Sequence, residues 1–220
     1  LLGIANDPTL VNLLVEYDTP IESPKTTLRL NGPRMGVSAV FGPNAERLQA
    51  PKDEGGYEMY PFTTQFGYQL ETQYLSAGNF QALIEFIGLI GGLEAGQIIP
   101  SLAFLNGFRG SKSGFEFAFG PVFKVVKLAD GYYDANKNWH LEDEWGIDTL
   151  NPKTNPYDIV ERVDSRGDYK LSTSLVVGVG KTFRSGYLNI PVNVYYIPNK
   201  RGDIIGMSIG FNINKKRKVQ

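Results

Sequence analysis

His140 is the only histidine of the chain, and the acidic residues 142–144 follow it closely. A histidine oriented by a carboxylate is the general base of Ser–His–acid hydrolases, and Ser172 or Ser174 could supply the nucleophile. No nucleophile-elbow sequence or other catalytic motif accompanies these residues. The sequence therefore predicts no catalytic residue, and it leaves hydrolysis of lipid open as an alternative.

Four charged residues stand opposite the bulky apolar residues of their segments, so their side chains are expected on the other face of a strand. In a closed barrel that face is the lumen, where an unpaired charge is costly. We therefore predict a polar network in the lumen, in which Lys124 neutralises Glu116 or Glu85. The members of this network are Glu71, Glu85, Glu116 and Lys124.

The residue types of the chain give little support for a metal site or a bound cofactor. The chain has no cysteine, which excludes disulfides, thiolate metal sites and thiol catalysis. The spacing of Asp134, Asn136 and Asn138 matches the first three ligands of a calcium loop. However, Trp139 stands where that loop requires glycine, and Trp145 stands where it requires glutamate. We predict no metal site and no cofactor.

The charge of the chain bears on its partners. The formal net charge is −1, so there is no electrostatic case for nucleic acid. The one basic cluster, residues 215–218, belongs to a short C-terminal tail over 215–220. We expect this tail to be solvated, with contact to anionic headgroups as the alternative.

The elements that position these side chains are strands with two unlike faces. Over residues 64–76, aromatic or apolar residues alternate with Gln, Gly and Glu, and residues 203–214 repeat the pattern. A period of two is the signature of a strand. Large apolar residues on one face and small or polar residues on the other suit a barrel that faces lipid outside and a polar lumen inside.

The connections between the strands alternate between short and long. Hairpin-length turns occur near 78, 111 and 186, whereas the connections over 43–63 and 129–168 are very long. We predict an all-β fold, an eight-stranded antiparallel transmembrane β-barrel of the outer-membrane type, with both termini on the periplasmic, short-turn side. The predicted strands cover 34–42, 64–76, 79–92, 97–109, 114–128, 169–184, 186–197 and 203–214.

Aromatic residues recur at the short-turn ends of the predicted strands, as in the girdle of a membrane barrel. They share the parity of the lipid face, and Tyr187 departs from it by one residue. The third and fourth strands are less regular, because Leu83, Ile87 and Ile99 fall on the lumen face. The girdle residues are Tyr74, Phe80, Phe108, Phe115, Phe183 and Phe211.

The chain divides into three predicted parts. Residues 1–30 form an N-terminal extension on the periplasmic side, 31–214 the barrel, and 215–220 the basic tail. No apolar stretch has the ~18 uncharged residues of a spanning helix. No basic-then-apolar leader opens at Leu1, so for an exported protein we expect the numbering to begin after processing or after a further stretch of chain.

The connection over 129–168 combines aromatic rings with many charges. Connections of this length are usually functional or disordered, and rings among polar residues favour an ordered binding surface. We predict that its aromatic residues contact another molecule. They are Tyr132, Tyr133, Trp139, Trp145 and Tyr157.

Segments 101–109 (SLAFLNGFR), 114–121 (GFEFAFGP) and 189–198 (NIPVNVYYIP) carry a family resemblance. They resemble small outer-membrane β-barrel proteins of the Bacteroidota, over roughly residues 31–214. The resemblance implies a diderm cell envelope and an outer-membrane location. It transfers no catalytic or binding residue, and it leaves open a place in a larger envelope assembly.

The leading functional interpretation is a non-enzymatic outer-membrane barrel, structural or accessory, that presents the external loops 43–63 and 129–168. Its expected partners are outer-membrane lipids and other outer-membrane or periplasmic proteins. One alternative is a lipid-modifying barrel enzyme. The other is a soluble lipocalin-like ligand-binding barrel, which would need large apolar residues inside and polar residues outside.

Overall fold

The computed structural model describes residues 30–77, 79–110, 112–145 and 155–213. The barrel strands are β1 (Gly32–Val40), β2 (Phe62–Ala77), β3 (Phe80–Gly91), β4 (Ile99–Gly110), β5 (Phe115–Tyr133), β8 (Asp168–Ser185), β9 (Leu188–Ile197) and β10 (Ile204–Gly210). The shorter elements are α2 (Pro43–Gln49), η1 (Leu93–Ala95), β6 (Trp139–Leu141), η2 (Glu142–Glu144), β7 (Val160–Val163) and β11 (Asn212–Ile213).

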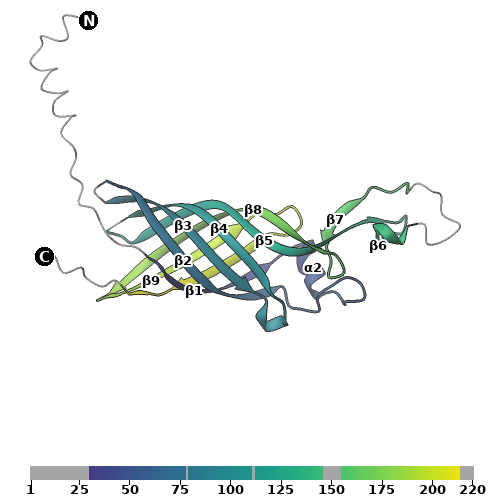
Figure 1. The fold of residues 1–220 in the computed structure, drawn as a ribbon, viewed down its shortest axis with the longest axis horizontal. Helices are drawn as coiled ribbons and strands as arrows, with labels where there is room; N and C mark the ends of the chain where they lie inside the picture. The colour runs from purple at the N-terminus through teal and green to yellow at the C-terminus, as the bar shows by residue number, and fades with distance from the viewer. Residues whose placement is uncertain (1–29, 78, 111, 146–154, 214–220) are drawn as a thin grey trace, which may run out of the picture.

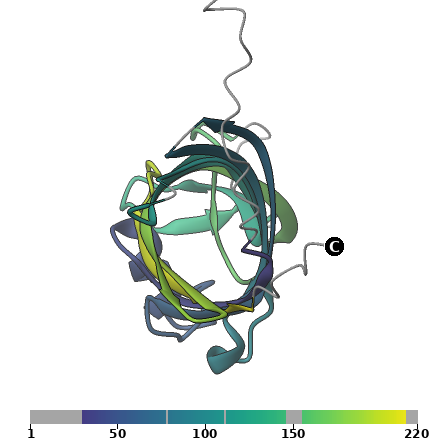
Figure 2. The same cartoon turned by 90° about the vertical axis from the view of Figure 1, so that its left-hand side faces the viewer.

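The barrel is closed by strand pairing. Neighbours pair antiparallel from β1 through β2, β3, β4, β5, β8 and β9, and β10 pairs with both β9 and β1. Figure 1 shows the barrel from the side, and Figure 2 looks into the resulting ring. Closure satisfies the backbone of every strand through a neighbour, which is the condition for a sheet in lipid. The predicted eight-stranded antiparallel barrel of the outer-membrane type is confirmed.

The outer face of the barrel carries large apolar side chains, as the alternation predicted. This arrangement contradicts the soluble lipocalin-like alternative, which requires a polar outer face. Exposed residues on this face include Phe66 and Leu70 of β2, Phe86 and Ile90 of β3, Phe117 and Phe119 of β5, Val179 of β8, Val194 of β9, and Ile205 and Met207 of β10.

Aromatic rings surround the end of the barrel at which the short turns lie. Tyr74, Phe80, Phe115 and Phe183 are all exposed there, as the predicted girdle requires. Phe80 stacks on Phe108 of the next strand, with 5.6 Å between ring centroids. The rings therefore occupy the height at which membrane barrels place their interfacial aromatics.

The irregular parity of the third and fourth strands has a physical explanation. Leu83 and Ile87 of β3 are buried and pair in register with Gly107 and Ala103 of β4. They lie in the lumen, because an eight-stranded barrel is just wide enough for side chains to fill its interior. Their place in the alternation therefore predicted correctly that both side chains face the lumen, although apolar side chains are unusual in a lumen.

At the opposite end, β5 continues past its predicted end at 128 and leaves the barrel. Its residues Leu128–Gly131 pair with β7, and Gly131–Tyr133 pair with β6. We call residues 129–145 and 155–167 the arm, which Figure 1 shows extending beyond the barrel with β6 and β7. The prediction of one long loop over 129–168 is therefore wrong in part. Beyond the barrel neither face of β5 contacts lipid. Its residues therefore need not alternate between apolar and polar, and the pattern that predicted the barrel strands ends there.

The start of β1 lies beside the interior charges. Leu30 is buried, and its N–H lies 3.4 Å from Glu71 Oε1. The Asn31 side-chain oxygen accepts a hydrogen bond from the Glu71 backbone N–H at 2.6 Å. The rest of the predicted extension over 1–30 and the tail over 215–220 lie outside the described residues. Among the described residues, no helix is long and apolar enough to cross a membrane.

Candidate functional site

The lumen is closed near the short-turn end by a buried ion-pair cluster, which we call the floor. Arg109, only 1% exposed, donates from Nη1 to Glu71 Oε1 at 2.8 Å and from Nε to Glu116 Oε1 at 2.7 Å. Its Nη2 also donates to Glu71 Oε2, and the Thr182 hydroxyl donates to Glu116. Both carboxylates are therefore paired with one guanidinium and hydrogen-bonded to it, which lowers the cost of burying them.

The prediction that Lys124 neutralises Glu116 is wrong. Arg109 lies directly opposite Glu116 in the pairing of β4 with β5. Lys124 lies eight residues further along β5, which is roughly 26 Å along a strand. The parity of Arg109, opposite to that of Phe108, was the signal in the sequence that would have identified it.

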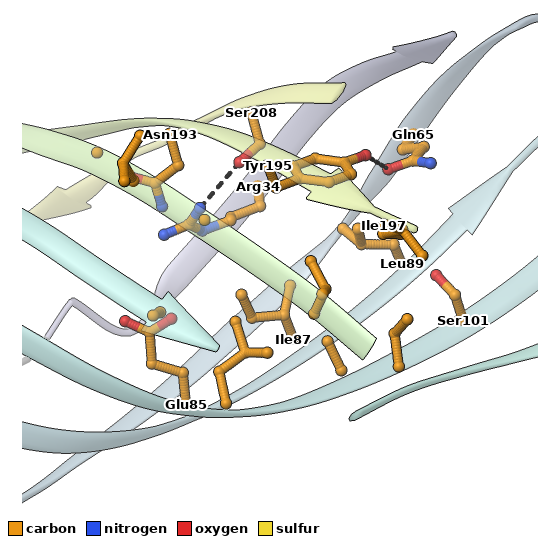
Figure 3. Close-up of a pocket in the computed structure, with 18 of the residues that line it drawn as sticks. Arg34, Gln65, Glu85, Ile87, Leu89, Ser101, Asn193, Tyr195, Ile197 and Ser208 are labelled. Carbon is orange, nitrogen blue, oxygen red and sulfur yellow. Dashed lines mark hydrogen bonds between the residues drawn. The ribbon is translucent and has the colours of Figure 1, made fainter. Parts of the chain in front are cut away.

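A second arginine lies above the floor. Arg34 of β1 is buried and donates from Nη1 to Ser208 Oγ at 2.9 Å, and from Nε to Gln69. Figure 3 shows Arg34 and Asn193 at the same end of the lumen as Glu85. Arg34 was not among the predicted lumen residues, although it alternates with the outward-facing Met35 in the same way as Arg109 with Phe108.

The other half of the lumen is apolar. In this half, a cluster of five buried residues from five strands lines a cavity of about 80 Å³. The prediction of a polar lumen is therefore wrong for this half, where aliphatic packing needs no hydrogen-bonding partners. The cluster consists of Ile87, Leu105, Val122, Val176 and Ile197.

Glu85 and Lys124 of the predicted network both line this cavity. Glu85 is 3% exposed. No hydrogen bond or ion pair joins either side chain to another residue in the described ranges. The structure thus brings Glu71 and Glu116 together through Arg109, places Glu85 opposite Glu71 in the pairing of β2 with β3, and leaves Lys124 apart.

The aromatic residues of the arm pack on one another. Tyr132 is 5% exposed and stacks on His140 and Tyr157, with ring centroids at 5.3 and 5.5 Å, while Trp145 meets it edge-on at 5.5 Å. Separately, Trp139 contacts Tyr133, with 5.1 Å between centroids. These rings order the arm, and Tyr133 remains 46% exposed. Their contact with another molecule stays a prediction.

His140 does not join a nucleophilic serine. Its ring nitrogens lie 3.4 Å from Asp134 Oδ2 and Glu144 Oε2. No hydrogen bond links it to Ser172 or Ser174, within the part of the chain that is described. Asp134 instead accepts hydrogen bonds within a tight turn. These bonds, to which the Asn138 backbone N–H contributes most, hold the pKa of the Asp134 carboxyl below its usual value. Across the same described residues, no three His, Cys, Asp or Glu side chains are grouped to hold a metal.

A buried carboxylate joins the arm to the connection over 41–61. Asp164 is fully buried and accepts hydrogen bonds from Arg166 Nε at 3.0 Å, Arg166 Nη2 at 2.9 Å and Arg162 Nη2 at 3.2 Å. Burial alone would raise the pKa of Asp164, but the hydrogen bonds from Arg166 and Arg162 outweigh it and hold the pKa below the usual value.

The contacts of Asp164 with residues 54–55 require a glycine. Ser165 N–H donates to Gly55 O at 2.9 Å, and Arg162 Nη2 donates to Glu54 O at 3.2 Å. Gly55 has φ +81°, and a Cβ there would lie 2.2 Å from the Asp164 carboxylate. We call residues 54–55 and 162–166 the Asp164 junction. This junction was not predicted from the sequence, although two arginines flank Asp164 at a spacing of two.

A large concavity of about 890 Å³ lies between the arm and the connection over 41–61. Its walls carry charges of both signs together with two aromatic residues. Tyr133 and Trp139 of the predicted interaction set are among them. Residues on its walls include Asn44, Arg47, Glu54, Tyr133, Trp139, Arg162 and Arg201.

Comparison with known proteins gives no family. No protein-family model and no curated protein matches the chain. Among solved structures, Ail, the attachment invasion locus protein of Yersinia pestis, is 11% identical and has a TM-score of 0.24, with 83% of this chain and 96% of that chain covered. Ail in complex with the heparin analogue sucrose octasulfate is 10% identical with a TM-score of 0.23, over the same shares. At these values the likeness carries no functional argument, and the fold rests on the strand pairing.

Replacing Arg109 with Met should destabilise the barrel strongly, because Glu71 and Glu116 would remain buried without a cation. The expected loss is about 3–5 kcal/mol in the free energy of unfolding, measured by urea titration of the barrel in lipid vesicles. Replacing Glu71 and Glu116 with Leu in the same variant should restore much of the loss. The exposed Lys181→Met is the control, and a loss as small as in this control would contradict the role of the floor.

The Asp164 junction should weaken at low pH. Because the folded-state pKa of Asp164 lies below its unfolded value of about 4, its contribution is complete above that pH and is lost as the pH falls through the folded pKa. Asp164→Asn should lower the hydrogen-exchange protection of residues 54–55 and 164–167 about 10-fold at neutral pH. The exposed Asp158→Asn is the control. Equal protection in both variants, with no change on acidification, would show that the junction does not depend on this carboxylate.

Proposed function

We propose that this chain is a non-enzymatic outer-membrane barrel that holds an ordered binding platform outside the membrane. The platform consists of the connection over 41–61 and the arm. The observation that carries the proposal is the Asp164 junction, because a buried, doubly paired carboxylate orders two connections that a structural barrel would not need to join. Connections of this length that are ordered are commonly functional.

The chemistry of the concavity favours a protein partner. Arginine and aromatic side chains are enriched at protein interfaces, and both line this surface. Arg162 lies over the Trp139 ring, 4.0 Å from its centroid, so the two present one rigid surface. The charges of both signs favour a partner with complementary charges over a uniformly anionic one.

The lengths of the connections support the proposed orientation in the membrane. Outer-membrane barrels have short periplasmic turns and longer external loops. On this basis the short turns and the start of β1 face the periplasm, and the platform faces outward. The resemblance of residues 101–109, 114–121 and 189–198 supports a place among the small barrels of the Bacteroidota, with outer-membrane lipids and other envelope proteins as partners.

A lipid-modifying enzyme is the less supported function. His140 lies in the arm, packed on Tyr132 and bonded to acidic side chains, whereas Ser172 and Ser174 belong to the barrel strand β8. Hydrolysis would need these groups within hydrogen-bonding reach of one another.

Photo-crosslinking in intact cells tests the proposed function. A photoreactive residue in place of Tyr133, on the wall of the concavity, should give a protein adduct of defined mass. The adduct should weaken when Asp164→Asn loosens the junction. The exposed Tyr187, in a turn at the other end of the barrel, is the matched control and should not give the same adduct.

Two results would overturn the proposal. One is the absence of a defined adduct at Tyr133 in cells while the purified barrel is always monomeric. The other is the same adduct from Tyr187, which would show that the crosslink does not report the platform. Protease added to intact cells should cleave the arm, and protection of the arm would reverse the proposed orientation.

A further inference from the structure

We propose that the apolar half of the lumen binds the hydrocarbon chain of a single-chain carboxylate, with the Lys124 ammonium holding the carboxylate. This site lies inside the barrel and is independent of the platform. The proposal rests on the cavity, on the charges at its two ends, and on the width of the barrel.

Aliphatic side chains contribute most of the cavity surface, with polar residues such as Gln65 and Tyr195 among the others, and the cavity is incompletely packed. The volume of about 80 Å³ is several times the ~10–15 Å³ that one water needs. Small residues occur on the walls, among them Ala103, Ala118 and Gly178. A Cβ added at Gly178 would lie 3.5 Å from its nearest neighbour, the Val194 carbonyl oxygen, so this wall has room for a larger side chain. Because barrel interiors of this size are normally filled by side chains, the space is suited to an apolar occupant.

The charges at the two ends of the cavity differ. Towards the floor, the carboxylates of Glu71, Glu85 and Glu116 face Arg34 and Arg109, so an added carboxylate would meet an acidic environment. Figure 3 shows Glu85 and Arg34 at one end of the cavity and Ser101 at the other, with Ile87 between them. The acidic end is therefore expected to exclude the head of an anionic ligand.

Lys124 lies at the Ser101 end. The two residues are opposite each other in the pairing of β4 with β5, close to the start of β4 at Ile99. The Lys124 ammonium has no hydrogen bond or ion pair with any residue of the described ranges. A cation at the margin of an apolar cavity, without an anion of its own, is a site for a carboxylate with an attached chain.

The width of the barrel limits the ligand to one chain. The interior of an eight-stranded barrel has about the width of packed side chains, and the aliphatic cluster already occupies part of it. A ligand with two acyl chains would not fit beside Ile87, Val122 and Val176. A linear chain directed from Lys124 towards the floor would contact these residues along its length.

The test uses the full chain in lipid nanodiscs and radiolabelled hexanoate in equilibrium dialysis, with hexanol as the uncharged analogue, because a cavity of about 80 Å³ holds about six heavy atoms at ~10–15 Å³ each. Saturable binding should exceed the partitioning into empty nanodiscs, and the chain should prefer hexanoate. Lys124→Met should weaken hexanoate binding about 10-fold or more and leave hexanol binding unchanged. Lys181→Met, an exposed lysine on the same barrel, is the matched control and should change neither.

A second variant tests the cavity itself. Ala118→Leu, placed on its wall, should reduce the binding of both ligands, with folding checked by the gel shift of the unheated barrel. If this variant does not fold, the ratio of hexanoate to hexanol binding in Lys124→Met decides the question. Uptake equal to that of empty nanodiscs, or an unchanged ratio in Lys124→Met, would overturn the proposal.

Discussion

The pairing of β10 with both β1 and β9 is the interaction on which the rest of the structure depends. In lipid, every backbone N–H and C=O needs a partner inside the protein, and only a closed ring of strands supplies one for each strand edge. Once the ring is closed, the alternation of side chains along each strand divides the residues into a lipid face and a lumen face. The exposed aromatic and aliphatic residues of the outer face, and the buried charges of the inner face, both follow from this constraint.

Closure with eight strands also sets the chemistry of the lumen. The interior is narrow, so each side chain that enters it must be paired or packed. At the short-turn end Arg109 pairs with Glu71 and Glu116, and further along aliphatic residues pack instead. The ion pairs of the floor and the aliphatic packing of the apolar half are thus two ways of burying side chains in the same narrow interior. Lys124 lies at one end of the cavity in the apolar half and Glu85 at the other, which is why the proposed ligand places its anionic head at Lys124 and its apolar chain along the aliphatic residues.

Much of this arrangement could be predicted from residue parity. Alternation placed Glu71, Glu85 and Glu116 in the lumen and the rings outside, because a period of two relates sequence directly to the two faces. Alternation also marks Arg109 as a lumen residue, but which lumen cation pairs with Glu116 depends on the register across the turn between β4 and β5. The Asp164 junction was beyond prediction for a similar reason. It depends on a contact with Gly55, far away in the sequence, and local patterning contains no information on such contacts.

The orientation of the strands is the central claim, and the absence of cysteine from the chain allows a direct measurement. Spin labels at single cysteines along β8, at positions 176 to 179, would report access to oxygen dissolved in lipid and to a water-soluble relaxation agent. The account predicts high oxygen access at Val177 and Val179, and low access at Val176 and Gly178. Uniform access along these positions, or contact of Val177 and Val179 with the water-soluble agent, would contradict it.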